Sequence, residues 1–414
     1  MLKRNFLIKY FLFVSFLSQG QDTVRFSITN DLGLIDYSKV QISNADKLNP
    51  FFQKLSQLKK SGKGIVSILH IGDSHVQGDY LTHKISQNFQ LEFGNAGRGF
   101  LTPNQVAQTN EGASYYSKSS GKWEAKRMVF IDQPLPIGLG GVTVKSFDEN
   151  AAIRITLKNY PGLDYSFNKV TVFLQQDDKS YHVAVQDTLN RSLAFVGNFT
   201  ESSTIHCASA NLPYLVNDIQ FQSIKSLPQQ IRTTYFGFSF ENGKPGILYH
   251  SIGANGAKYR HYLAAEYFVE QTSALKPDLI VIALGTNEAL DYPYSDPKFK
   301  EDVKSLIDEL QKRNQGAQFI ISIHPDSYRK KTKRNPGVNN IRKSILEVAE
   351  QKHLSVFDLY EACGGNHSAD DWKKSELLRD DGVHFTRVGY ELQGDAFYLA
   401  LMKAFNQYVS NRRK

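Results

Sequence analysis

Three short polar segments carry side chains that could act together as a nucleophile, an oxyanion donor and an acid–base pair. Ser74 stands in a Gly-Asp-Ser-His segment, and a serine on a tight turn presents both its hydroxyl and its backbone N–H. Asn287 stands in Gly-Thr-Asn-Glu and offers an amide donor. Asp381 and His384 have the Asp-x-x-His spacing in which a carboxylate can orient the imidazole that takes the serine proton. Each segment alone is commonly a turn, so the prediction rests on their combination.

A glycine-containing loop is a fourth candidate. Residues 251–257 read Ser-Ile-Gly-Ala-Asn-Gly-Ala and contain both Gly253 and Gly256. Because glycine has no Cβ, the backbone here can approach a substrate closely and present an N–H. An ordinary flexible loop is the alternative interpretation.

The elements that would position these segments follow an α/β pattern. The apolar run 65–71 predicts a buried strand, and a helix is expected over 48–60. Beyond residue 258 helices and strands alternate, with helices predicted over 259–275, 298–313, 338–352 and 388–408 and strands over 278–284, 318–323 and 354–359. Such alternation predicts a mostly parallel sheet with helices on both faces. Ligands bind at the carboxyl edge of such sheets, where the polar segments would converge.

The middle of the chain has a different pattern. Between residues 101 and 245, short alternating runs predict strands over 152–157, 169–174, 181–185 and 233–240. Turn residues separate these runs, as is typical of an antiparallel sandwich, so we expect a β domain to interrupt the α/β domain. Four aromatic residues of this segment could stack on sugar rings or simply fill its core: Tyr115, Tyr116, Trp123 and Tyr235.

In this order, the four segments resemble the sequence blocks of the SGNH (GDSL) hydrolase superfamily. The resemblance covers about residues 45–100 and 246–410. It implies an α/β fold of the SGNH type, with a flavodoxin-like three-layer parallel sheet. It also implies a catalytic triad in which Ser74 is the nucleophile, His384 the base and Asp381 the residue that orients the base.

The same resemblance implies an oxyanion hole. Its donors would be the N–H groups of Ser74 and Gly256 and the side-chain amide of Asn287. Two positions depart from the usual pattern of the family. Glu288 stands where an aspartate is usual, which leaves the asparagine in place, and His75 stands where leucine is common.

The insertion narrows the resemblance. The serine block followed by the glycine-rich run 94–100 resembles periplasmic peptidoglycan O-acetylesterases, in which a carbohydrate-binding-type jelly roll separates the blocks. This implies a discontinuous hydrolase domain over 21–100 and 246–414, with a jelly-roll-like β-sandwich over 101–245. The implied function is a serine esterase that removes O-acetyl groups from a glycan, with peptidoglycan as the first candidate. Acetyl transfer onto polysaccharide hydroxyls and glycan binding on an inactive hydrolase are the alternatives.

The N-terminus predicts export. Residues 1–20 have a basic start, an apolar run and a small or polar end, which is the order of a signal peptide. No other segment approaches the roughly 18 continuous apolar residues of a membrane helix, so we expect a periplasmic or secreted product without a membrane span. Cys207 and Cys363 would then meet an oxidising compartment, and whether they pair is left open.

The composition fits a globular protein. The 414 residues are 41% apolar and 22% charged, which is too apolar for a disordered chain and long enough for two domains. The 49 basic and 41 acidic residues give +8, and removal of Lys3, Arg4 and Lys9 with the signal leaves 46 minus 41, or +5. So small a surplus predicts no nucleic-acid partner.

A two-metal phosphoesterase is the rival interpretation. Asp73 and His75 form Asp-x-His, and residues 365–367 read Gly-Asn-His, both of which are pieces of a site that bridges two cations. Such a site also needs a Gly-Asp segment between them, and none occurs between Asp79 and Gly394. We therefore expect no metal or organic cofactor. Three further histidines at strand ends are expected to be satisfied core residues: His70, His250 and His324.

Overall fold

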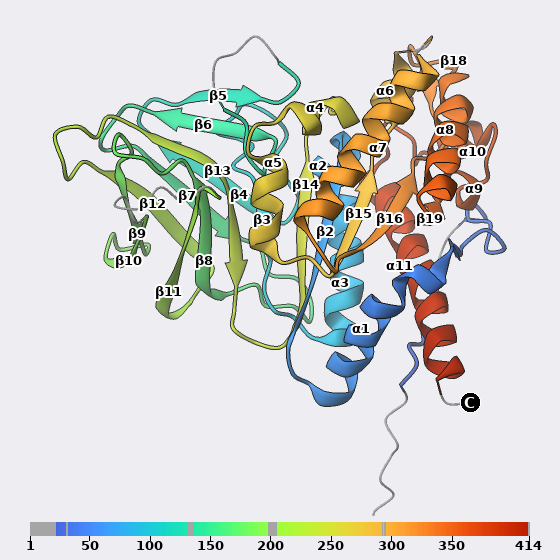
Figure 1. The fold of residues 1–414 in the computed structure, drawn as a ribbon, viewed down its shortest axis with the longest axis horizontal. Helices are drawn as coiled ribbons and strands as arrows, with labels where there is room; N and C mark the ends of the chain where they lie inside the picture. Colours follow the sequence, from blue (N-terminus) through green and yellow to red (C-terminus); the bar gives the residue numbers. More distant parts are fainter. Residues whose placement is uncertain are drawn as a thin grey trace, which may run out of the picture.

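The described chain has an α/β part and a β-rich part that lie side by side (Figure 1). The computed structural model describes residues 22–29, 32–130, 136–197, 205–291, 293 and 295–412. The expected signal peptide, residues 1–20, lies outside the described residues.

The α/β part is built on a six-stranded sheet of order β1-β19-β16-β15-β2-β14. Its strands are β1 Ile42–Ser43, β2 Ile65–Gly72, β14 Gly246–Gly253, β15 Leu279–Ala283, β16 Gln318–Ile323 and β19 Ser355–Asp358. Every neighbouring pair is parallel except β1 with β19. The mostly parallel sheet predicted from the alternation of elements is confirmed.

Helices cover both faces of this sheet, because successive strand residues point to opposite faces. Val66 and Ile68 of β2 pack in one hydrophobic core, whereas Leu69 and Ile71 pack in the other. The first core contains residues of α1 Asn49–Ser61, α3 Tyr80–Phe93 and α11 Arg387–Asn411. The second contains residues of α4 Tyr259–Ala264, α7 Asp296–Arg313 and α8 Gly337–Gln351. The result is a three-layer α/β fold.

The single helix predicted over 259–275 is wrong. The structure has α4 here, followed by α5 (Phe268–Thr272) and a short 3₁₀ turn. Ala265 is extended, with φ −75° and ψ 113°. The N–H of Tyr267 donates to the carbonyl of Ile137 at 2.9 Å instead of to a helical partner. This contact with the middle segment of the chain interrupts the helix that periodicity alone suggests.

The β-rich part consists of two antiparallel sheets, of order β10-β9-β12-β7-β4 and β11-β8-β13-β6-β5, with β3 beside β13. The strands are β3 Gly99–Leu101, β4 Tyr115–Ser120, β5 Glu124–Arg127, β6 Val142–Ser146, β7 Ala152–Leu157, β8 Phe167–Leu174, β9 His182–Gln186, β10 Ser192–Val196, β11 Cys207–Val216, β12 Asp218–Ile224 and β13 Thr233–Glu241. Ile153 and Phe221 of one sheet share a hydrophobic core with Val172 and Phe238 of the other. The two sheets therefore pack face to face.

The four aromatic residues singled out in this part have different positions. Tyr115 and Tyr235 are buried in the core, and Trp123 stacks on Tyr235 with ring centroids 5.9 Å apart. Tyr116 is 54% exposed, whereas Trp123 is partly buried against the core.

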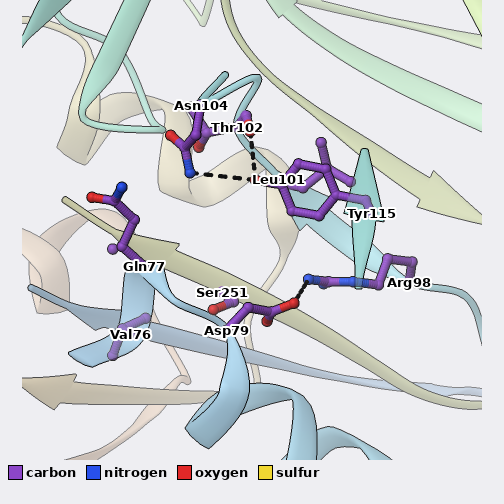
Figure 2. Close-up of a pocket in the computed structure, with 10 residues that line it drawn as sticks. Val76, Gln77, Asp79, Arg98, Leu101, Thr102, Asn104, Tyr115 and Ser251 are labelled. Carbon is purple, nitrogen blue, oxygen red and sulfur yellow. Dashed lines mark hydrogen bonds and ion pairs between the residues drawn. The ribbon is translucent and has the colours of Figure 1, made fainter. Parts of the chain in front are cut away.

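A buried ion pair joins the two parts. Arg98, just before β3, donates from Nη2 to Oδ2 of Asp79 at 2.7 Å, and the hydroxyl of Ser114 donates to the same carboxylate. Burial alone would raise the pKa of Asp79, but the Arg98 charge and the hydrogen bonds hold it below its usual value. Figure 2 shows this pair beside Tyr115 and close to Gln77. This ion pair therefore holds the segment that leads into the β-rich part against the helices that follow β2.

Two remaining features are the state of the cysteines and the apolar character of the helices. Cys207 in β11 and the buried Cys363 are both free thiols. Within the described ranges, no helix combines the length and the apolar character needed to cross a bilayer.

Candidate active site

Ser74 lies on the turn that follows the central strand β2. It is the first residue of α2 (Ser74–Gln77), and Asp73 caps this helix by accepting the N–H of His75 at 3.0 Å. The first N–H groups of a helix have no partner within the helix, so that of Ser74 can serve a substrate. Burial raises the pKa of Asp73, although the bond from His75 lowers it.

His384 and Asp381 come from the loop that precedes α11. The backbone N–H groups of Val383 and His384 each donate to Oδ1 of Asp381 at 2.8 Å, and Oδ2 lies 2.9 Å from Nδ1 of His384. Partial burial would raise the pKa of Asp381, but these hydrogen bonds hold it below its usual value. The ionised carboxylate therefore favours the tautomer with the proton on Nδ1.

The structure brings Ser74, His384 and Asp381 into one chain of hydrogen bonds. Nε2 of His384 lies 2.8 Å from Oγ of Ser74, although the two residues are 310 positions apart in sequence. The side chain of His384 is 31% exposed. The hydroxyl can donate to Nε2, and the imidazole can accept that proton when Oγ attacks a carbonyl carbon.

A cavity of about 550 Å³ lies next to these three hydrogen-bonded residues. We call it the Ser74 cavity. Ser74, Asp381 and His384 line it, together with residues of both parts of the molecule. Asn110 and Glu111 precede the first long strand of the β-rich part and form one wall. The β-rich part thus contributes directly to the site.

Gln77 ties the glycine loop to the helix that carries Ser74. Its Oε1 accepts the backbone N–H of Asn255 at 2.6 Å. Its Nε2 donates to the carbonyl of Asn110 at 2.7 Å and to Oγ1 of Thr109 at 3.0 Å. One buried amide therefore fixes the glycine loop and the 109–110 segment against α2.

The two glycines of the loop have different surroundings. Gly253 lies in β14 opposite Gly72 of β2, and a Cβ on it would overlap backbone atoms of Asp73 and Gln77. Gly256 lies beyond the strand with φ +81°, and the nearest atom to a Cβ there would be 3.6 Å away. Position 253 requires glycine because a Cβ there would overlap neighbouring backbone atoms. Position 256 favours glycine because its φ is positive.

Asn287, in α6 (Thr286–Leu290), lies between the glycine loop and Asp73. Its Nδ2 donates to the carbonyl of Ala257 at 3.0 Å and makes a longer contact of 3.4 Å with Oδ2 of Asp73. The structure thus places Asn287 against both neighbours of the proposed oxyanion site, with its amide engaged by protein acceptors. The following residue, Glu288, is buried and accepts the N–H of Tyr259 at 2.9 Å. Burial raises the pKa of Glu288 to about 7.

His75 packs against the imidazole of the proposed base. The ring centroids of His75 and His384 are 5.2 Å apart, and Nδ1 of His75 lies 2.8 Å from the hydroxyl of Tyr390 in α11. Burial lowers the pKa of His75 to about 3, so this ring is neutral near pH 7. It forms an uncharged wall behind His384.

The three histidines expected in the core are buried there. Nδ1 of His70 lies 2.7 Å from the hydroxyl of Tyr249, Nδ1 of His250 accepts the N–H of Phe100 at 3.0 Å, and His324 contacts a neighbouring carbonyl. In the part of the chain that the structure describes, no group of three or more His, Cys, Asp or Glu side chains is arranged to hold a metal ion.

A serine, a histidine and an aspartate joined in this way, at the carboxyl edge of a three-layer α/β sheet, have the geometry of a serine hydrolase. Residues 222–392 match the model of the GDSL-like lipase/acylhydrolase family, and this match places the protein among the carboxylic ester hydrolases. The match includes Gly256, Asn287, Asp381 and His384, whereas Ser74 precedes it. The resemblance predicted from the sequence blocks is confirmed.

Comparison with solved structures extends the likeness in fold to most of the chain. A peptidoglycan O-acetylesterase is 19% identical with a TM-score of 0.74, covering 91% of this chain and 100% of that chain, which shows a common fold. A lipase/acylhydrolase from Enterococcus faecalis is 26% identical, with a TM-score of 0.30 over 38% of this chain and 77% of that chain. An acetylxylan esterase from Geobacillus stearothermophilus is 20% identical, with a TM-score of 0.30 over 38% and 73%. A search of curated proteins found no match.

Sequence reasoning missed the residues that hold the site together. Gln77, Asn255 and Tyr390 all line the Ser74 cavity, but none was predicted to. Asn255 stands inside the glycine loop, so its position was a usable signal. Gln77 lies three residues beyond Ser74, one helical turn along, which also indicates a neighbour of the nucleophile. The contact of Tyr390 with His75 spans 315 positions and has no local signal.

Proposed function

We propose that this protein is a serine esterase that removes O-acetyl groups from a glycan, with Ser74 as the nucleophile. The observation that carries the proposal is the 2.8 Å separation of Ser74 Oγ from His384 Nε2, with Asp381 on the other ring nitrogen. Ser74 Oγ attacks the acetyl carbonyl carbon while its proton moves to His384. Collapse of the tetrahedral intermediate breaks the bond to the sugar oxygen, and His384 returns the proton to that oxygen.

The second half of the reaction regenerates the enzyme. Water attacks the acetyl group on Ser74 and loses a proton to His384. Acetate leaves as Ser74 Oγ is protonated again. The N–H groups of Ser74 and Gly256 and the amide of Asn287 stabilise the oxyanion in both halves. For this role, the Asn287 N–H that now makes the 3.4 Å contact with Asp73 turns to the substrate.

Peptidoglycan is the glycan we propose first. The fold shared with a peptidoglycan O-acetylesterase over 91% of this chain, β-rich part included, supports this choice. We assign residues 21–100 and 246–414 to the hydrolase and 101–245 to a jelly-roll-like insert that contacts the glycan. Residues 1–20 have the pattern of a signal peptide, which suits a periplasmic or secreted enzyme acting on cell-wall material.

The test is acetate release from O-acetylated peptidoglycan and from a small aryl acetate, by the wild type and by Ser74→Ala. We expect the wild type to release acetate from both and the variant to release it from neither. If the acetyl group reached glycan hydroxyls in place of water, the product would be a more acetylated glycan, and acetyl transfer would replace hydrolysis. If the wild type bound the glycan but turned over no ester, the binding alternative would replace both.

A further inference from the structure

A second hollow opens beside the Ser74 cavity. This side groove has a volume of about 350 Å³. It shares three lining residues with the Ser74 cavity, namely Tyr80, Glu111 and Arg387. The two hollows therefore adjoin, so a polymer with its acetylated sugar at Ser74 would extend towards the side groove.

The outer wall of the side groove belongs to the β-rich part. Tyr116 stands on β4, which is the last strand in the order of its sheet. Lys158 and Tyr160 follow β7, the partner of β4. Tyr160 packs against His83 of α3, with ring centroids 4.2 Å apart. The groove is thus a seam between the insert and the hydrolase, walled by tyrosine rings that suit the flat faces of sugars.

Two cations lie on opposite sides of this seam. Nζ of Lys158 donates to the carbonyl of Ala113 at 2.8 Å and lies 3.8 Å from the centroid of the Tyr116 ring. An ammonium has three donors, so one remains for a ligand. On the hydrolase side, Nε of Arg387 donates to Glu391 at 2.7 Å, which leaves guanidinium N–H groups available.

Glu111 is the only acidic residue among those that line the side groove. Its carboxylate is turned to the protein, because it accepts the N–H of Ser117 at 3.0 Å and the hydroxyl of the same residue. Partial burial raises the pKa of Glu111. Because the Glu111 carboxylate is engaged by Ser117, the charged groups left to meet a ligand in the side groove are Lys158 and Arg387, which favours an anion.

We propose that the side groove is a subsite for a free carboxylate of the same substrate, held between Lys158 and Arg387 while the acetylated sugar occupies the Ser74 cavity. Cationic donors on both sides match a carboxylate, and the tyrosines match a neighbouring sugar ring. This inference rests on the proposed function and specifies its substrate class as an anionic glycan.

The experiment compares two forms of one substrate. O-acetylated muropeptides are used as prepared and after their carboxylates have been converted to amides, and kcat/KM for acetate release is measured for each. The readout is the ratio of the two values within one enzyme, because damage to folding or to the triad affects both forms alike. We expect the wild type to prefer the free carboxylate about tenfold.

Lys158→Gln and Arg387→Gln should each move this ratio towards one. Lys225→Gln is the matched control, because Lys225 is an exposed lysine of the insert outside both hollows, and it should leave the ratio unchanged. A wild type without preference, or a ratio unmoved in both groove variants, would overturn the subsite.

Failure of the proposed function gives a different result. In that case the wild type would release no acetate from either muropeptide form or from a small aryl acetate. Calorimetric binding of the two forms would then decide the subsite by the same ratio. Equal affinity for both forms would overturn it, and a preference for the carboxylate that is lost in Lys158→Gln would support it.

Discussion

The backbone N–H of Asn255 donates a 2.6 Å hydrogen bond to Oε1 of Gln77, three residues beyond the proposed nucleophile. Because Nε2 of Gln77 also donates to the carbonyl of Asn110 at 2.7 Å, one side chain fastens both the glycine loop and the insert to α2. The position of Gly256 relative to Ser74 therefore depends on this amide.

Replacing Gln77 with methionine, which keeps the length and removes the amide, should lower kcat for a small aryl acetate by about 10- to 100-fold, with a smaller change in KM. The loop that carries the oxyanion donor would no longer be held in place. Thr109→Val is the matched control, because it removes only the 3.0 Å contact to the insert. Equal losses in the two variants, or a fully active Gln77→Met, would show that the bond to Asn255 does not position the loop.

Asp381→Asn should lower kcat by about 10³- to 10⁴-fold while the fold is kept. The amide oxygen can still accept the two backbone N–H groups, but the negative charge that orients His384 and stabilises its imidazolium is lost. The neighbouring exposed carboxylate offers the control, and Asp380→Asn should retain wild-type kinetics. Comparable impairment of both variants would point to a general charge effect on the loop.

Asn287→Ala should lower kcat by about 10²- to 10³-fold, since it removes one donor from the oxyanion hole. Affinity for a boronic acid that forms a tetrahedral adduct with Ser74 should fall by a similar factor. Asn287 also holds the carbonyl of Ala257, so thermal unfolding is measured alongside. A rise in KM alone, with kcat and boronate affinity intact, would restrict Asn287 to a role in holding the loop.

Glu288 should make the protein less stable as the pH rises. Burial raises its pKa from 4.5 to about 7, so between these values the folded protein holds a proton that the unfolded chain has released. Stability from this group is present below about pH 4.5 and is lost as the pH rises towards 7, by about 3 kcal/mol in total. Urea unfolding of Glu288→Gln should lack this decline. If the free energy of unfolding had the same pH dependence in the wild type and in Glu288→Gln, this would contradict a buried Glu288 carboxyl with a raised pKa.

The sequence was sufficient where local pattern decides the structure. Strands such as β2 are apolar runs buried on both faces, and α1 shows its buried face through Phe51, Phe52, Leu55 and Leu58. Because the segments of Ser74 and Asn287 follow such strands and that of His384 precedes the last helix, their approach to one sheet edge could be predicted. The distances among Ser74, His384 and Asp381 agree with that expectation.

The remainder depends on contacts between distant parts of the chain. Helix α3 buries polar residues such as His83 and Gln90, because it lies between the sheet and the insert, where Tyr160 and Tyr165 meet them. Its pattern therefore does not read as a simple amphipathic helix. The break after α4 likewise depends on Ile137, and the bond between Gln77 and Asn255 spans 178 positions. Such contacts leave no periodic signal in the sequence.

The central claim is that Ser74 is the nucleophile activated by His384. The most direct measurement is covalent labelling with an organophosphonate ester, followed by peptide mass spectrometry of the wild type and of His384→Ala. We expect a single adduct on Ser74 in the wild type, loss of esterase activity in proportion to labelling, and labelling at least 10²-fold slower, on the order of a lost general base, in His384→Ala. An adduct on another side chain, or full acetate release from protein labelled at Ser74, would contradict the account.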